Sequence, residues 1–142
     1  MAELPSPLVL DTNVVLDWLV FRDPAAAPLG PALAQGQWCW HATAAMRSEL
    51  EQVLTYDALA AWSPDVDEVL RQWERWVRYV DPADAPLSAG LRCTDSDDQK
   101  FIDLALQLGR CTLLSRDRAV LRLARRAAPW GVSILAPQRW QP

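Results

Sequence analysis

Residues 8–19 read LVLDTNVVLDWL, and this stretch decides the fold. Its first three residues, Leu8-Val9-Leu10, form a short apolar run, and the next three, Asp11-Thr12-Asn13, are polar. Apolar side chains then return at helical spacing from Val14 to Leu19. The pattern predicts a buried strand, an acidic turn and a helix, in that order.

The alternation of strands and helices continues along the chain. Further helices are predicted over Thr43–Leu54, from Ser63-Pro64 to Val77, over residues 95–108 and from Asp117 through Ala124. Residues 22–36 are predicted to form a loop that contains at most one short helix, Leu29–Ala34. Further strands are predicted at 38–40, 111–114 and 132–135, and a proline-containing loop at 81–90. This order predicts one α/β domain over residues 1–142, whose mostly parallel central sheet has helices on both faces.

Composition excludes several classes of protein. The 142 residues are 51% hydrophobic and 23% charged, which is too apolar for disorder and long enough for one core. The start, Met1 to Pro5, lacks the basic residues and long apolar run of a secretory signal, and no apolar stretch is of membrane-spanning length. We therefore expect a cytoplasmic protein with no membrane segment.

Cysteine usage and net charge narrow the chemistry further. Three cysteines without a C-x-x-C pair favour buried free thiols over a disulfide framework or a thiolate zinc site. The net charge of −4 argues against broad electrostatic adhesion to nucleic acid. Any nucleic-acid chemistry must therefore come from a local site.

Four separated acids are predicted to converge on one edge of the sheet. Asp11 ends the first strand and Asp117 lies just beyond the strand at 111–114, so both face the crevice where open α/β sheets bind ligands. Asp98 heads a helix, and Glu49 projects from another. Two like charges 4 Å apart repel by about 4 kcal/mol at an effective dielectric of 20, and a divalent cation removes that cost. An all-carboxylate set suits Mg²⁺ or Mn²⁺ better than zinc.

Each acid also has a purely structural interpretation. Asp11 and Asp117 could simply cap the helices that follow them, and at least one acid of the Asp95-Ser96-Asp97-Asp98 cluster should serve only as a cap or dipole partner. Asp95 and Asp97 stay open as supporting residues. Glu51 competes with Glu49, but the two point about 200° apart on a helix, so only one faces the site.

Four short motifs carry a family resemblance. They are Asp11-Thr12-Asn13-Val14, Glu49-Leu50-x-x-Val53-Leu54, Asp98-x-x-Phe101-Ile102-x-x-Ala105 and Ser115-x-Asp117. In order and spacing they resemble the PIN-domain nucleases, particularly the branch of toxins from toxin–antitoxin systems (VapC-like). The resemblance implies a metal-dependent endoribonuclease with Asp11, Glu49, Asp98 and Asp117 as metal ligands. Asn13 and Ser115 would be polar supporting residues, and Mg²⁺ or Mn²⁺ the cofactor.

The resemblance also implies partners and leaves alternatives. It implies an RNA substrate, an antitoxin protein and a homodimer. Separately, Arg92, Arg116 or Arg118 lie close in sequence to the acids and could hold phosphates near the site. Two other functions are considered. One is a non-catalytic module that binds RNA or protein on the same fold. The other is a haloacid-dehalogenase-like phosphatase, which Asn13 disfavours because that family opens with D-x-D. We expect Trp73 and Trp76 to lie in the core or a dimer interface rather than to stack on bases.

Overall fold

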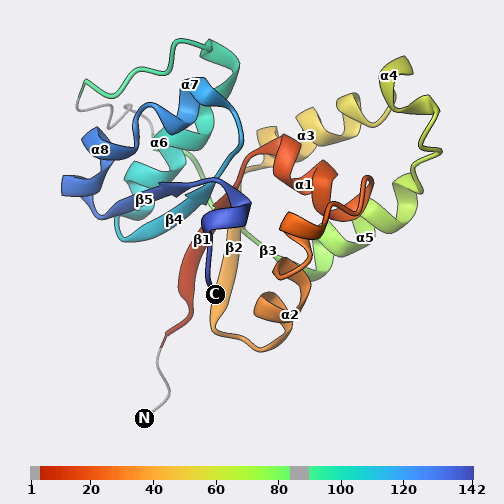
Figure 1. The fold of residues 1–142 in the computed structure, drawn as a ribbon, viewed down its shortest axis with the longest axis horizontal. Helices are drawn as coiled ribbons and strands as arrows, with labels where there is room; N and C mark the ends of the chain where they lie inside the picture. Colours follow the sequence, from red (N-terminus) through yellow and green to blue (C-terminus); the bar gives the residue numbers. More distant parts are fainter. Residues whose placement is uncertain (1–3, 84–89) are drawn as a thin grey trace.

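The computed structural model describes residues 4–83 and 90–142 and contains a parallel five-stranded sheet in the order β3-β2-β1-β4-β5 (Figure 1). The strands are β1 (Ser6–Leu10), β2 (Trp38–Ala42), β3 (Val77–Tyr79), β4 (Cys111–Leu114) and β5 (Val132–Leu135). The longer helices are α1 (Thr12–Leu19), α2 (Leu29–Ala34), α3 (Ala44–Val53), α5 (Val66–Trp76) and α6 (Gln99–Leu108). Four-residue helices are α4 (Asp57–Ala60), α7 (Arg118–Leu121) and α8 (Ala124–Ala127). The α/β prediction with a parallel sheet is confirmed.

Helices cover both faces of this sheet. The chain moves outward from β1 to β3 through α1 to α5, and then returns past β1 to β4 and β5 through α6 to α8. Right-handed crossovers in opposite directions place these two groups of helices on opposite faces, as Figure 1 shows. Leu8, Val9 and Leu10 are buried on both faces of the central strand. Because helices cover both faces of this strand, all three successive residues are apolar rather than alternately apolar and polar.

A tryptophan cluster fills the core under α1 and α5. The Trp40 side chain is fully buried on β2, and its ring meets the rings of Trp18 and Trp73 edge to face at centroid distances of 5.9 and 4.8 Å. Such pairs contribute beyond their buried area. The prediction that Trp73 belongs to the core is confirmed, whereas Trp76 is half-buried at the rim.

The predicted helix from Ser63 to Val77 is wrong at both ends. Ser63 has a φ of 42°, outside the extended backbone that a cap residue needs, and the helix begins at Val66 with Asp65 as its cap. At the other end, Val77 leaves the helix and opens the edge strand β3 beside Trp40. Val66, the first residue of the helix, is exposed although it is apolar.

Other departures are smaller. The segment predicted as one helix through residues 117–124 is divided into α7 and α8, and a 3₁₀ turn at Pro24–Ala26 and helix α4 were not predicted. Cys93 and Cys111 are buried free thiols as expected, but Cys39 is only half-buried. In the loop predicted at 81–90, residues 84–89 lie outside the described residues.

Two further features concern the outside of the molecule. Across the described residues, every helix is too short or too polar to cross a bilayer. Leu4 and Pro142 line one shallow hollow with Trp38, at the amino edge of the sheet. Both described ends of the chain therefore lie together, on the side where the strands begin.

Candidate metal centre

The sheet order makes β1 and β4 the switch point of the sheet, and we call the space beyond the carboxyl ends of these two strands the crevice. Chain connections leave these neighbouring strands in opposite directions, which is the switch point where open α/β sheets bind ligands. Leu10 pairs with Leu114 at the carboxyl ends of the two strands, and the Asp11 N–H donates to the Leu114 carbonyl at 3.0 Å. Asp11 and Ser115 are therefore the first residues beyond the sheet on adjacent strands.

Ser115 joins the two acids that flank the crevice. Its hydroxyl donates to Asp11 Oδ2 at 2.7 Å and accepts from the Asp117 N–H at 3.1 Å, while Asp11 Oδ1 accepts from the Asn13 N–H at 3.1 Å. Ser115 and Asp11 are almost completely buried. Burial raises the pKa of Asp11 despite these hydrogen bonds, and the charges of Asp117 and Glu49 act in the same direction. Asp11 is thus held rigidly where a negative charge is costly.

The opposite wall is the acidic turn before α6. A 3₁₀ turn, Ser96–Asp98, is capped by Asp95, whose carboxylate accepts from the Asp97 N–H at 3.0 Å. Gln99 braces the preceding segment, because its side chain accepts from the Cys93 N–H at 2.6 Å and donates to the Leu91 carbonyl at 2.9 Å. The turn is therefore fixed to the start of α6 at a defined position.

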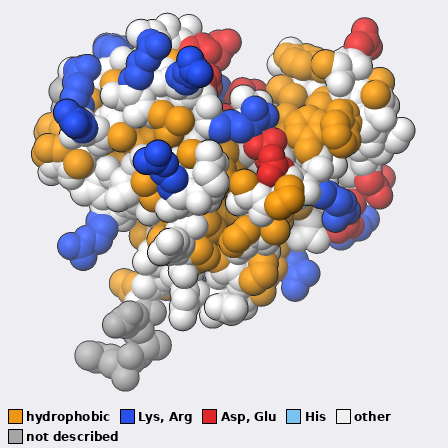
Figure 2. Space-filling view, in the orientation of Figure 1, with side chains coloured by type: hydrophobic (Ala, Val, Ile, Leu, Met, Phe, Trp, Pro, Cys, Tyr) orange, Lys and Arg blue, Asp and Glu red, His pale blue; other side chains and the backbone are white. Residues whose placement is uncertain are grey.

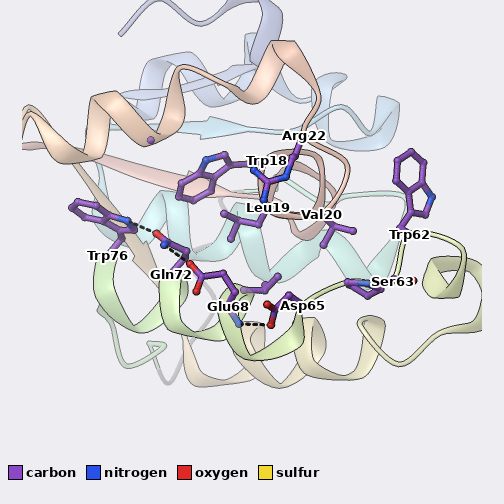
Figure 3. Close-up of a pocket in the computed structure, with 13 residues that line it drawn as sticks. Trp18, Leu19, Val20, Arg22, Trp62, Ser63, Asp65, Glu68, Gln72 and Trp76 are labelled. Atoms are coloured by element: carbon purple, nitrogen blue, oxygen red, sulfur yellow. Dashed lines mark hydrogen bonds between the residues drawn. The ribbon is translucent and has the colours of Figure 1, made fainter.

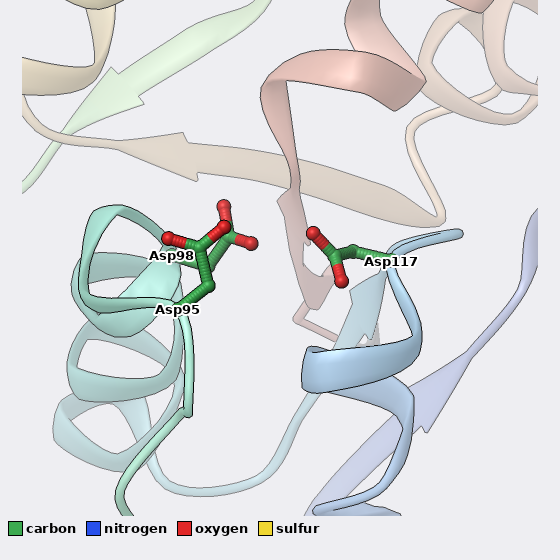
Figure 4. Close-up of side chains that lie close together, drawn as sticks. All are labelled: Asp95, Asp98 and Asp117. Carbon is green, nitrogen blue, oxygen red and sulfur yellow. The ribbon is translucent and has the colours of Figure 1, made fainter.

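Asp95, Asp98 and Asp117 meet across the crevice (Figure 4). One carboxylate oxygen from each lies within 4.8 Å of the others. Burial, a hydrogen bond with Asp117 and the charge of Asp11 raise the pKa of Asp98 to about 8, while the same hydrogen bond lowers the pKa of Asp117. Without a cation, the pair therefore holds a proton between its carboxyl groups near neutral pH.

Glu49 lies at the edge of this group. Its charge contributes to the raised pKa of Asp11, but its carboxylate forms an ion pair with Lys100 at 2.5 Å and is not one of the three that meet. Glu51 points elsewhere, into an ion pair with Arg47 at 3.3 Å. Of the two glutamates, Glu49 is the one turned toward the crevice.

The remaining predicted residues take other positions. The Asn13 side chain is exposed and supports Asp11 only through its backbone N–H. Arg116 is engaged by the nearly buried Asp17, with Nε 2.7 Å from Oδ2, whereas Arg92 and Arg118 are exposed. Asp97 is exposed, and its carbonyl accepts from Lys100.

Sequence reasoning underrated or missed three residues at this centre. Asp95 was only an open supporting residue, although a capping acid three residues before Asp98 can face the same way. Asp17 and Gln99 were not considered, and their partners, Arg116 and the Cys93 N–H, give no local pattern in the sequence.

The donor set fits a hard divalent cation. Among the described residues, those that meet here are carboxylates, and the charges of Asp11, Asp117 and Asp95 add to burial in raising the pKa of Asp98. Oxygen ligands suit Mg²⁺ or Mn²⁺, whereas zinc normally takes His or Cys. The group of possible ligands does not include His41, which lies on β2 and whose pKa is lowered by burial. A cation placed here would have carboxylate oxygens of Asp95, Asp98 and Asp117 around it, with buried Asp11 beside them.

A second hollow, of about 460 Å³, lies between α1 and α5 (Figure 3). Its polar lining residues satisfy one another along α5. Trp76 Nε1 donates to Gln72 at 3.0 Å, Gln72 donates to Glu68 at 2.9 Å, and Asp65 caps the helix. No acid of the crevice between β1 and β4 lines it. It is therefore not part of the metal centre.

Comparison with known proteins gives one match. Residues 7–119 match the sequence profile of a family described as PIN domain. The matched segment begins at β1 and ends within α7, so it contains all the acids that surround the crevice. No curated protein matches the chain.

Proposed function

Because the chain belongs to the PIN domain family, whose domains are generally nucleases, we propose that it is a Mg²⁺- or Mn²⁺-dependent endoribonuclease. The observation that carries this proposal is the meeting of the Asp95, Asp98 and Asp117 carboxylates beside buried Asp11. Carboxyl groups whose pKa is strongly shifted by burial and by a neighbouring charge gather at functional sites. Carboxylate oxygens that meet at a switch point are the ligands that a phosphate-binding Mg²⁺ or Mn²⁺ needs.

Each acid has a defined part in the proposal. Asp11, Glu49, Asp98 and Asp117 hold the cation, and Asp95 is added as a fifth candidate. A bound divalent cation would neutralise phosphate charge, make water more acidic and stabilise the leaving oxygen. Asp98 would give up to solvent the proton that it shares with Asp117 when a cation binds, while Ser115 orients the Asp11 carboxylate and accepts from the backbone N–H of Asp117. The reaction is hydrolysis of an RNA phosphodiester, without a covalent protein intermediate.

The test is cleavage of single-stranded RNA by the purified chain with Mn²⁺ or Mg²⁺. Chelation by EDTA should abolish cleavage, and so should Asp11→Asn and Asp98→Asn. Asp97→Asn is the matched control for Asp98→Asn because its side chain is exposed one residue away. Glu51→Gln is likewise the control for Glu49→Gln.

A second readout separates a binding module from an enzyme. Mn²⁺ should raise the unfolding temperature of the native chain and of the Asp97→Asn control, but not of Asp98→Asn, because a ligand stabilises only the state that binds it. Cation binding without cleavage of any RNA would favour the non-catalytic module. Cleavage that persists in EDTA and in Asp11→Asn would refute the proposed mechanism, whatever the substrate.

The finer biological role is proposed from the resemblance. We assign the chain to the toxins of type II toxin–antitoxin pairs, with an antitoxin protein as partner and a homodimer as the assembly. Expression of the native chain should arrest growth, and expression of the Asp98→Asn variant should not. Light scattering of the purified protein tests the dimer. Harmless expression together with RNA cleavage in vitro would leave a nuclease that is not a toxin.

A further inference from the structure

Charge is divided unevenly along the chain. All 18 acidic residues lie at or before Asp117, and the segment 118–142 contains five arginines and no acid. The net charge of −4 therefore combines a strongly acidic first part with a basic last part. Figure 2 shows Lys and Arg side chains gathered over the part of the molecule that carries α7 and α8.

Three of these arginines form one face of α7 and α8. We call Arg118, Arg122 and Arg125 the arginine stripe. They are spaced by four and three residues, which places them on the same side of a helix. Arg122 and Leu123, between the two short helices, keep helical dihedral angles, and so the spacing holds across the junction. The buried residues Val120, Leu123 and Ala127 occupy the opposite side.

Among the described residues, no acidic side chain pairs with the arginine stripe. Its three side chains are exposed, and within residues 4–83 and 90–142 they take part in no ion pair or side-chain hydrogen bond. Arg116, two residues earlier, differs because Asp17 holds it. Arg126, at the side of the stripe, donates to the Gly90 carbonyl at 2.7 Å. The stripe therefore presents three free guanidinium groups to solvent.

The arginine stripe begins one residue after an acid of the metal centre. Asp117 caps α7, and Arg118 is the next residue. From there the stripe extends about 10 Å, taking 1.5 Å per residue over seven residues. An anion that lies along the stripe thus has one end at Arg118, the residue that follows Asp117 in the chain.

We propose that the arginine stripe binds successive backbone phosphates of the RNA strand and leads that strand to the metal centre. The inference rests on the proposed function, since it takes the polyanion to be the substrate. Guanidinium groups bind phosphate oxygens bidentately and carry no base preference at such contacts. Because the chain is acidic overall, this local patch supplies the attraction that the net charge does not.

The experiment measures RNA binding apart from cleavage. Fluorescence anisotropy follows a short labelled single-stranded RNA of mixed sequence in EDTA, with gels to confirm that the RNA stays intact. The stripe variant carries Arg118→Gln, Arg122→Gln and Arg125→Gln. The control carries Arg71→Gln, Arg75→Gln and Arg78→Gln, which remove the same charge from exposed positions on α5 and β3, at the other edge of the sheet.

The stripe variant should bind RNA about tenfold more weakly, whereas the control should bind as the native chain does. Over about 50–200 mM salt, the slope of log K against log salt should become less steep by about 2, since each lost phosphate contact on a single strand accounts for roughly 0.7. With active protein, KM should rise and kcat should stay unchanged.

Two results would overturn the inference. Equal losses in the stripe and control variants would mean that only net charge matters. Unchanged affinity and salt slope in the stripe variant would mean that the stripe serves another partner, such as an acidic protein. Neither result depends on cleavage, so the nuclease proposal could stand while the stripe proposal fails. RNA binding that depends on the stripe, without any cleavage, would support the stripe proposal and count against the nuclease proposal.

Discussion

Ser115→Ala tests whether one hydroxyl organises the metal centre. The hydroxyl lies between Asp11 Oδ2, to which it donates at 2.7 Å, and the Asp117 N–H, from which it accepts at 3.1 Å. Both Ser115 and Asp11 are buried, so water cannot readily replace the lost donor. Alanine removes the hydroxyl and leaves the rest of the packing in place.

The expected loss of stability follows from the group left unsatisfied. A buried acceptor without its donor costs about 1–3 kcal/mol, and hydrogen bonds to charged groups lie in the upper half of that range. We therefore expect a loss of about 2 kcal/mol in the free energy of unfolding. In a domain of this size the unfolding temperature should fall by roughly 4–8 °C. The affinity for Mn²⁺ should fall about 10- to 100-fold, because Asp11 is no longer oriented.

Urea unfolding followed by tryptophan fluorescence measures the stability, and calorimetric titration measures Mn²⁺ binding. Asp65→Ala is the matched control, because it removes the cap of α5 at an exposed position away from the crevice. Its expected cost is about 1 kcal/mol, with unchanged Mn²⁺ affinity. The comparison separates a general loss of stability from a loss at the site.

Two results would refute the reasoning about Ser115. A stability change below about 0.5 kcal/mol would show that Asp11 finds another donor. A loss of stability with unchanged Mn²⁺ affinity, the pattern expected of Asp65→Ala, would show that Ser115 supports the fold and not the cation.

Three further outcomes are expected. Arg116→Gln leaves the Asp17 carboxylate nearly buried and unpaired, and it should lower the free energy of unfolding by about 1–2 kcal/mol at about pH 8. The loss should be smaller at about pH 5, because Asp17 can take up a proton more readily there. Urea unfolding at both pH values checks this, with exposed Arg118→Gln as a near-neutral control. In EDTA, the stability of the fold should fall as pH rises from about 4 to about 8, because Asp98 keeps its proton to about pH 8 in the folded state and loses it near 3.8 in the unfolded state. An unfolding temperature that rises over this pH window would contradict the raised pKa of Asp98. Trp40→Ala should lower the free energy of unfolding, measured in urea, by about 3–5 kcal/mol because the ring is fully buried between Trp18 and Trp73. A loss below about 1 kcal/mol would mean that neighbouring side chains move into the vacated space.

The elements that could be predicted from sequence are those with long or doubly covered apolar patterns. Strands at 111–114 and 132–135 have the predicted bounds. Each is a short, mainly apolar segment between a glycine-containing turn and a following turn, which limits where it can begin and end. The edge strand β3 could not be separated from α5, because Val77 continues the apolar stripe of the helix while its backbone is already extended. Tertiary pairing with β2, not local preference, decides that boundary.

For the metal centre, sequence identified residue types better than contacts. Asp11 and Asp117 follow from strand ends, and the structure turns Glu49 rather than Glu51 toward the crevice, as the helical register suggested. The closeness of Asp95 to Asp98 and Asp117 depends on a 3₁₀ turn that no periodicity reveals. The hydroxyl link between Ser115 and Asp11 joins residues 104 positions apart, and so only the folded chain shows it.

The neighbouring ends of the described chain have a practical consequence. Leu4 and Pro142 share a hollow at the amino edge of the sheet, whereas the carboxylates lie at its carboxyl edge. A tether attached at either end would anchor the molecule to a bead or slide with its crevice facing the solution. A short peptide could also join the two ends, and the ring could then be reopened at an exposed loop, which compact domains often tolerate. Such permuted chains would allow the order of the acidic and basic parts to be exchanged without moving a single carboxylate.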